Sequence, residues 1–178
     1  EGCGYVDMGE AMNKNQICEL AIEFFTESLA EQTSISPARR WLKENHDFLQ
    51  NFSHPPFELA GYAPAEWDAL VLFAAGHGVS GGELVDVGLA LERPNNPGHY
   101  YDRFRNRIMI SVRHKGVVVE FGGYSVTNAP PKLVIVVPRH IQADPVFYQD
   151  VQTMIDRAGV EALTRLNAQI ALEKKGES

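Results

Sequence analysis

The chain has 178 residues, of which 44% are hydrophobic and 22% are charged, and its formal net charge is −7. This composition excludes collagen-like, low-complexity and wholly disordered proteins, and an acidic chain gains no general attraction to nucleic acid or anionic lipid. The longest apolar runs, residues 69–75 and 133–137, fall far short of the roughly 20 residues that a spanning helix needs, so we expect no membrane protein.

Amphipathic helices are predicted in the first part of the chain. Residues 1–12 are rich in glycine and lack periodicity, which indicates an irregular start. Apolar residues over 17–29 recur at helical spacing and predict the first helix. Ser36 is a favourable cap before a proline, so a second helix is expected to begin there.

A loop and a third helix are predicted next. Two prolines and a glycine within residues 51–63 argue against regular structure and predict a loop. A helix is expected from Pro64 to Gly76, with Trp67 in its buried stripe. The glycine-rich segment Gly76–Gly82 follows as a flexible connector.

Strands are predicted in the second half of the chain. Apolar residues alternate over 85–91, which indicates a strand, and the proline-rich segment 94–98 ends it. Residues 108–112 and 117–121 alternate on either side of a short turn and predict an antiparallel hairpin. The run 133–137 is apolar on both faces, so we expect it in the middle of the sheet.

Two helices are predicted at the end of the chain, one from Asp144-Pro145 to Gly159 and another from Val160, with residues 174–178 frayed. The order of elements predicts one α+β domain over residues 1–178. Its mostly antiparallel sheet would have about four strands over residues 84–137, packed by the N-terminal and C-terminal helices.

The charge is distributed unevenly. Residues 93–115 carry six basic side chains against Asp102, a net of +5, whereas the 92 residues before them are strongly acidic. This basic segment is interpreted either as an anion site or as a surface neutralised by the acidic N-terminal helices. Tyr100, Tyr101 and Phe104 interleave with the arginines, which is typical of single-stranded nucleic-acid binding and also of protein interfaces. Because the rest of the chain is acidic, we expect a protein partner with an acidic surface rather than a nucleic acid.

Cys3 and Cys18 are the only cysteines. They could form one disulfide bridge, but a chain of this size does not need one, so two free thiols in a cytoplasmic protein are expected. The first twelve residues do not resemble a signal peptide. The chain begins with Glu, so removal of a leader would instead fit a periplasmic or secreted protein.

A cysteine-dependent hydrolase is the alternative function. Cys18 lies on a predicted helix and precedes His114 and His99, either of which would be the base. Glu19 beside the thiol argues against this reading, because a neighbouring acid raises a thiol pKa. His77, between two glycines, is a further candidate catalytic residue or an ordinary surface histidine.

No metal or cofactor is expected, because the six histidines lack metal-ligand spacing and no Cys-x-x-Cys pair is present. His99 and Asp102 could share one side of a helical turn, but a metal site there would need a third ligand from elsewhere in the fold. A third candidate site, for phosphate or nucleic acid, would form if Arg113 and His114 lie at the same sheet edge as Arg139 and His140; the alternative is that the two ends point opposite ways. A related phosphate site would combine His77 with Arg139 and His140.

The sequence therefore favours a small protein-binding or regulatory module that engages an acidic partner through the segment 93–115. Its candidate binding residues are Arg93, Tyr100, Tyr101, Arg103, Arg105, Arg107, Arg113, Arg139 and His140.

Overall fold

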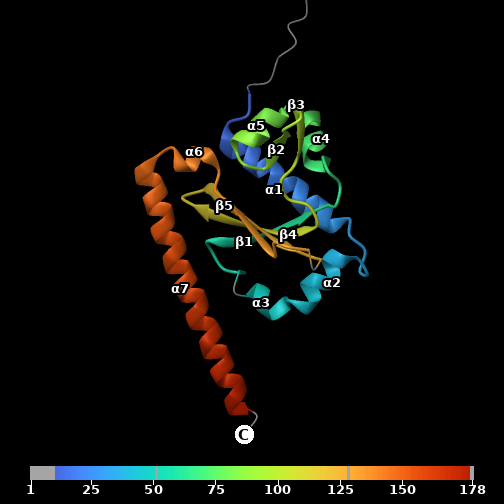
Figure 1. Ribbon diagram of the computed structural model, residues 1–178. Helices are drawn as coiled ribbons and strands as arrows, with labels where there is room; N and C mark the ends of the chain where they lie inside the picture. Colours follow the sequence, from blue (N-terminus) through green and yellow to red (C-terminus); the bar gives the residue numbers. More distant parts are fainter. Residues whose placement is uncertain (1–10, 51, 128, 177–178) are drawn as a thin grey trace, which may run out of the picture.

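The computed structural model describes residues 11–50, 52–127 and 129–176, with side chains up to residue 161. Its centre is a four-stranded antiparallel sheet in the order β1-β4-β5-β6, which confirms the predicted α+β class (Figure 1). The strands of this sheet are β1 (Phe57–Ala63), β4 (Arg107–His114), β5 (Val117–Ser125) and β6 (Leu133–Val136). The predicted irregular start lies outside the described residues except for residues 11 and 12. Of the predicted frayed end, residues 174–176 belong to the last helix, and residues 177–178 lie outside the described part.

The helix α1 (Lys14–Ala30) covers one face of this sheet. Asn13 and Gln16 form a capping box at its start, with Gln16 N donating to Asn13 Oδ1 at 2.9 Å. Phe25 of the helix lies edge-on to Phe121 of β5, and both rings are fully buried. The predicted first helix is therefore confirmed, and it supplies the main core.

The opposite face of the sheet is covered at two places. The helices α2 (Pro37–Glu44) and α3 (His46–Gln50) lie at one end, and α6 (Arg139–Gln142) and the first turns of α7 (Pro145–Gly176) lie at the other (Figure 1). Ser36 caps α2 as predicted. The predicted break at Gly159 is wrong, because α7 continues through it; one glycine inside a helix costs only about 1 kcal/mol.

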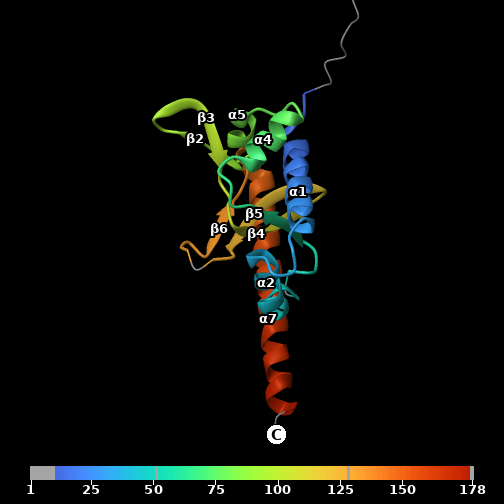
Figure 2. The same cartoon turned by 90° about the vertical axis from the view of Figure 1, so that its right-hand side faces the viewer.

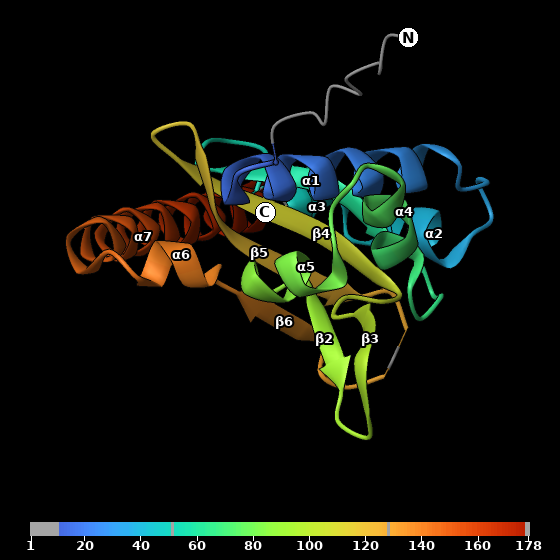
Figure 3. The same cartoon turned by 90° about the horizontal axis from the view of Figure 1, so that it is seen from above.

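A small second layer packs beside α1. It consists of α4 (Ala69–Gly76), α5 (Gly81–Asp86) and a two-stranded hairpin, β2 (Ala90–Arg93) and β3 (Asn96–Asp102), whose tip projects from the body (Figures 2 and 3). The predicted strand over 85–91 is wrong except at its end, because only residues 90 and 91 belong to β2. Ser80 and Glu83 form a capping box that begins α5. Gly88 at φ +80° then ends the turn before β2.

The predicted loop over 51–63 is also wrong, because β1 occupies its second half. Both prolines precede the strand, and Gly61 lies inside it, where the pairing with β4 shifts register. Gly61 has a φ of +133°, and an added Cβ would lie 2.0 Å from the carbonyl oxygen of Phe25. The glycine therefore marks a bulge that lets α1 approach the strand, which is a structural use of glycine within a strand.

Two burial predictions fail as well. The run 133–137 forms the edge strand β6 rather than a central one, and Ile135 remains 56% exposed. Trp67 precedes α4 and is 57% exposed. An apolar side chain does not by itself report which partner will cover it. Within the described residues, no helix is long and apolar enough to cross a membrane, as expected.

Candidate functional site

The end of β3 is fixed to the start of α4 by a buried carboxylate. Asp102 is 2% exposed and accepts hydrogen bonds from the backbone N–H groups of Leu70 at 2.8 Å and Val71 at 3.0 Å. Its own N–H donates to the carbonyl oxygen of Trp67 at 2.7 Å. Burial raises the pKa of Asp102 to about 6, although the two N–H donors act in the opposite direction. This anchor determines where Trp67 and the arginines after Asp102 lie.

Arg105 lies over the ring of Trp67. The guanidinium carbon is 3.6 Å from the Trp67 ring centroid and 5.6 Å from that of Tyr101. Arg93 approaches the same two rings at 6.0 and 5.9 Å. Trp67 and Tyr101 meet edge-to-face at 5.7 Å. We call these four residues the Trp67 platform.

The platform borders a hollow of about 380 Å³ between Trp67 and the turn of the β2–β3 hairpin. The residues around it are Trp67, Arg93, Pro94, Asn95, Asn96 and Tyr101. The hollow therefore combines exposed aromatic rings with a guanidinium group. Sequence reasoning missed Trp67 because it was assigned to the buried stripe of a helix. The arginines that contact its ring, Arg93 and Arg105, are distant in sequence, so the residues around Trp67 gave no signal of this role.

Arg103 and Arg107 continue the basic segment. Arg107 is buried and donates to the carbonyl oxygens of Gly123 at 3.0 Å and Pro131 at 2.9 Å. Arg103 is half-buried, its pKa is lowered by burial and further by the charge of Arg139, and its Nε has no hydrogen-bond partner. The guanidinium group of Arg103 therefore lies near Arg139, and its Nε makes no hydrogen bond within the described residues.

Carboxylates neutralise only one end of the basic segment. Arg113 donates to Glu19 of α1 through two nitrogens and to Glu58 at 2.9 Å. His114 and Lys115 both contact Asp150 of α7, at 2.8 and 2.7 Å. By contrast, within the part of the chain that the structure describes, Arg93, Arg103, Arg105, Arg107 and Arg139 form no salt bridge. The interpretation as internal neutralisation therefore holds for residues 113–115 only.

The two candidate loops lie at the same end of the sheet but do not share a site. The antiparallel pairing of β5 with β6 places Arg139 and His140 beyond the end at which the β4–β5 hairpin turns. Arg113 and His114, however, are held by the carboxylates described above, whereas Arg139 lies near Arg103. Both ring nitrogens of His140 are buried without a partner, and burial lowers its pKa.

The cysteine and histidine candidates do not form a catalytic arrangement. Cys18 is fully buried, and its pKa is raised to about 12, first by burial and then by Glu19. His114 contacts Asp150 instead of the thiol, and His99 lies exposed on β3. His77 is an exposed residue at the end of α4, with Nδ1 2.9 Å from the carbonyl oxygen of Phe73. Cys3 lies outside the described residues, and those residues contain no group of three metal-ligating side chains.

Comparison with known proteins identifies DNA primases among the relatives of this chain. Residues 24–134 match the family model "DNA primase catalytic core, N-terminal domain". The DNA primase of Deinococcus radiodurans is 36% identical over 127 residues, which are 70% of this chain and 21% of that protein. The DNA primase of Synechococcus elongatus is 35% identical over 119 residues, 66% of this chain and 17% of that protein. The chain therefore spans about a fifth of the length of these relatives.

Solved structures agree with these matches. A DnaG primase catalytic domain bound to ssDNA has a TM-score of 0.54 at 28% identity, over 69% of this chain and 37% of that chain. The Escherichia coli primase catalytic core has a TM-score of 0.53 at 29% identity, over 70% and 38% of the two chains. These findings contradict both the generic protein-binding module and the cysteine hydrolase. With more than half of its residues matched, the chain belongs to the family of DNA primase catalytic core N-terminal domains.

Proposed function

We propose that this chain is the part of a DNA primase that holds the single-stranded template, and that the Trp67 platform is its main contact. The observation that carries the proposal is Arg105 seated 3.6 Å over the ring of an exposed tryptophan. Proteins that bind single strands combine aromatic rings, on which bases stack, with basic groups that follow the phosphates. The Trp67 platform has both. The solved relative bound to ssDNA supports the same ligand class.

Each member of the platform has a distinct part in the proposed complex. Trp67 and Tyr101 offer ring faces on which unpaired bases can stack. Every base can stack in this way, so we expect a weak sequence preference. Arg93 and Arg103 contact phosphates. Arg105 is held against Trp67 and adds a cation next to the stacked base. Arg107 has a structural part, because its guanidinium joins β4 to the carbonyl groups of Gly123 and Pro131.

The acidic net charge restricts where a strand can lie. The chain carries 23 acidic against 16 basic side chains, so most of its surface repels phosphate. Within the described residues, Arg93, Arg103, Arg105 and Arg139 form no salt bridge, and we call these four side chains the basic strip, which runs from the β2–β3 hairpin to α6. A strand is therefore attracted to one face and excluded from the others.

Fluorescence anisotropy with a labelled oligothymidylate tests this proposal. We expect Trp67→Ala and Arg105→Ala to weaken binding by roughly tenfold each. Removal of one phosphate contact, Arg103→Ala, should reduce the slope of log K against log salt by about 0.7. Arg40→Ala is the matched control, because Arg40 is an exposed arginine of α2 outside the strip. Binding by Arg105→Ala equal to that of the wild-type chain, or an equal loss in Arg40→Ala, would overturn the proposal.

A further inference from the structure

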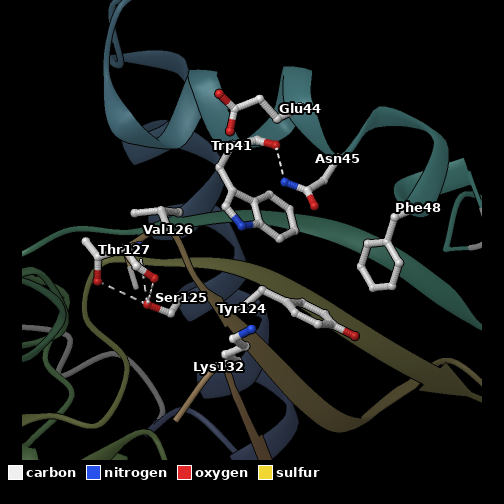
Figure 4. A pocket seen from close by; sticks show the side chains of 9 residues that line it. All are labelled: Trp41, Glu44, Asn45, Phe48, Tyr124, Ser125, Val126, Thr127 and Lys132. Carbon is white, nitrogen blue, oxygen red and sulfur yellow. Dashed lines mark hydrogen bonds between the residues drawn. The ribbon is translucent and has the colours of Figure 1, made fainter. Parts of the chain in front are cut away.

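A second aromatic pocket lies between α2–α3 and the end of β5. It encloses about 380 Å³, which is within the range of small-ligand sites. Figure 4 shows Trp41 and Phe48 on the helical side, Tyr124 on the strand side, and Lys132 below them. The full lining is Trp41, Glu44, Asn45, Phe48, Tyr124, Ser125, Val126, Thr127 and Lys132, and we call it the Trp41 pocket.

The rings of the pocket present both faces and edges. Trp41 and Tyr124 lie 5.8 Å apart at an interplanar angle of 32°. Phe48 meets Tyr124 edge-on at 5.2 Å and an angle of 81°, and it is 39% exposed. Aromatic faces at the border of an open hollow are the groups on which a planar base stacks.

The polar groups of the pocket favour a neutral base over a free nucleotide. Among the described residues that line the pocket, only Lys132 and Glu44 are charged, and their charges cancel. A nucleoside triphosphate carries several negative charges and gains no net attraction there. The amide of Asn45 and the hydroxyl groups of Ser125 and Thr127 offer hydrogen bonds to the edge of a base.

The Trp41 pocket is continuous with the segment that carries the Trp67 platform. Val126 N donates to the carbonyl oxygen of Asn106 at 3.0 Å. Arg107 donates to the carbonyl oxygen of Pro131, which precedes Lys132. The residues that directly follow Arg105 are thus hydrogen-bonded to the wall of the pocket. The pocket wall therefore adjoins the residues that follow Arg105, so a strand that extends beyond the platform at this end of the sheet passes close to Lys132.

We propose that the Trp41 pocket binds a second unpaired base of the same single strand, several nucleotides from the base at the Trp67 platform. This inference rests on the proposed function, because the arginine strip must hold the strand before the pocket can take a base. Stacking in the pocket adds affinity only to strands long enough to reach both sites.

A length series of oligothymidylates tests the inference. We expect the affinity of the wild-type chain to rise in two steps between dinucleotides and strands of roughly sixteen nucleotides. Trp41→Leu and Tyr124→Leu should lose the second step, with roughly tenfold weaker binding of the longest strands and unchanged binding of the shortest. Trp41→Phe keeps a ring and should retain most of the step. Lys132→Ala is compared with Lys43→Ala, an exposed lysine of α2 outside the lining.

A second readout leaves Trp41 intact. The chain has two tryptophans, so Trp67→Phe makes Trp41 the only one. Long strands should quench its fluorescence and short strands should not. The inference would be overturned if Trp41→Leu folds and binds strands of every length as the wild-type chain does. It would also be overturned if free thymidine nucleotide quenches the Trp41 fluorescence as strongly as long strands do. Failure of the proposed function is distinguishable, because Arg105→Ala would then leave the binding of short strands unchanged.

Discussion

The buried carboxylate of Asp102 makes the stability of this domain depend on pH. Burial raises the pKa of Asp102 from 3.8 to about 6, so the folded state holds a proton that the unfolded state has released. The contribution of Asp102 to stability is therefore most favourable below pH 4, becomes less favourable as the pH rises between about 4 and 6, and stays constant above that. The difference of roughly two pKa units corresponds to about 3 kcal/mol.

Asp102→Asn isolates this effect. The amide oxygen accepts one of the two N–H bonds from Leu70 and Val71, so the other donor is left unsatisfied at a cost of about 1–3 kcal/mol at every pH. The variant carries no charge to bury, however. We expect it to be less stable than the wild-type chain at pH 4.5 and to become equal or superior by pH 7.5.

Urea denaturation of both proteins at several pH values measures the difference. Asp86→Asn is the matched control, because Asp86 is exposed at the end of α5. A constant difference between wild type and Asp102→Asn across this range would refute the raised pKa. A difference that grows with pH would show that the two N–H donors outweigh burial.

Three further predictions concern the core and its connections. Gly61→Ala should destabilise the fold by at least about 3 kcal/mol, because the new Cβ would clash with the Phe25 carbonyl group and the φ of +133° is strained for alanine. Gly78→Ala is the control: it lies in open space at φ +78° and should cost about 1 kcal/mol in the same urea titration. Cys18, in a Cys3→Ser background, should react with Ellman's reagent at pH 8 only when the chain unfolds, since burial raises its pKa to about 12; labelling at the rate of the denatured chain would contradict this. Arg113→Ala should lower the free energy of unfolding by about 1 kcal/mol at low salt and by less at high salt, because it removes half-exposed ion pairs to Glu19 and Glu58. An equal decrease in Arg40→Ala would show that these ion pairs do not stabilise the fold.

The unequal pairing of the basic segment explains how one cluster can serve both the fold and the proposed function. Arg113 and Lys115 connect β4 and its turn to α1, β1 and α7, so their charges are used within the molecule. Arg93, Arg103 and Arg105 form no salt bridge within the part of the chain that the structure describes. Their charges remain available to phosphates.

Local patterns by themselves determined the parts of the fold whose partners are close in sequence. The hairpin of β4 and β5 was predicted from alternation around a turn in which Lys115 and Gly116 adopt φ values of 51° and 78°. The starts of α1 and α2 were predicted because a cap depends on residues within one turn. The arginine and tyrosine cluster was also identified from the sequence, and its role in binding stays a prediction.

Only the tertiary structure decided the features that depend on distant partners. β1 is a strand because β4, about fifty residues later, offers it hydrogen bonds, and β6 is an edge strand because nothing described pairs beyond it. Trp67 is exposed because it precedes α4, whose first turn is held by the distant Asp102, and the side chain that contacts its ring is Arg105. Which arginines stay unpaired depends on where α1 and α7 place their carboxylates. These are contacts between segments far apart in the chain, and periodicity within a short window carries no information about them.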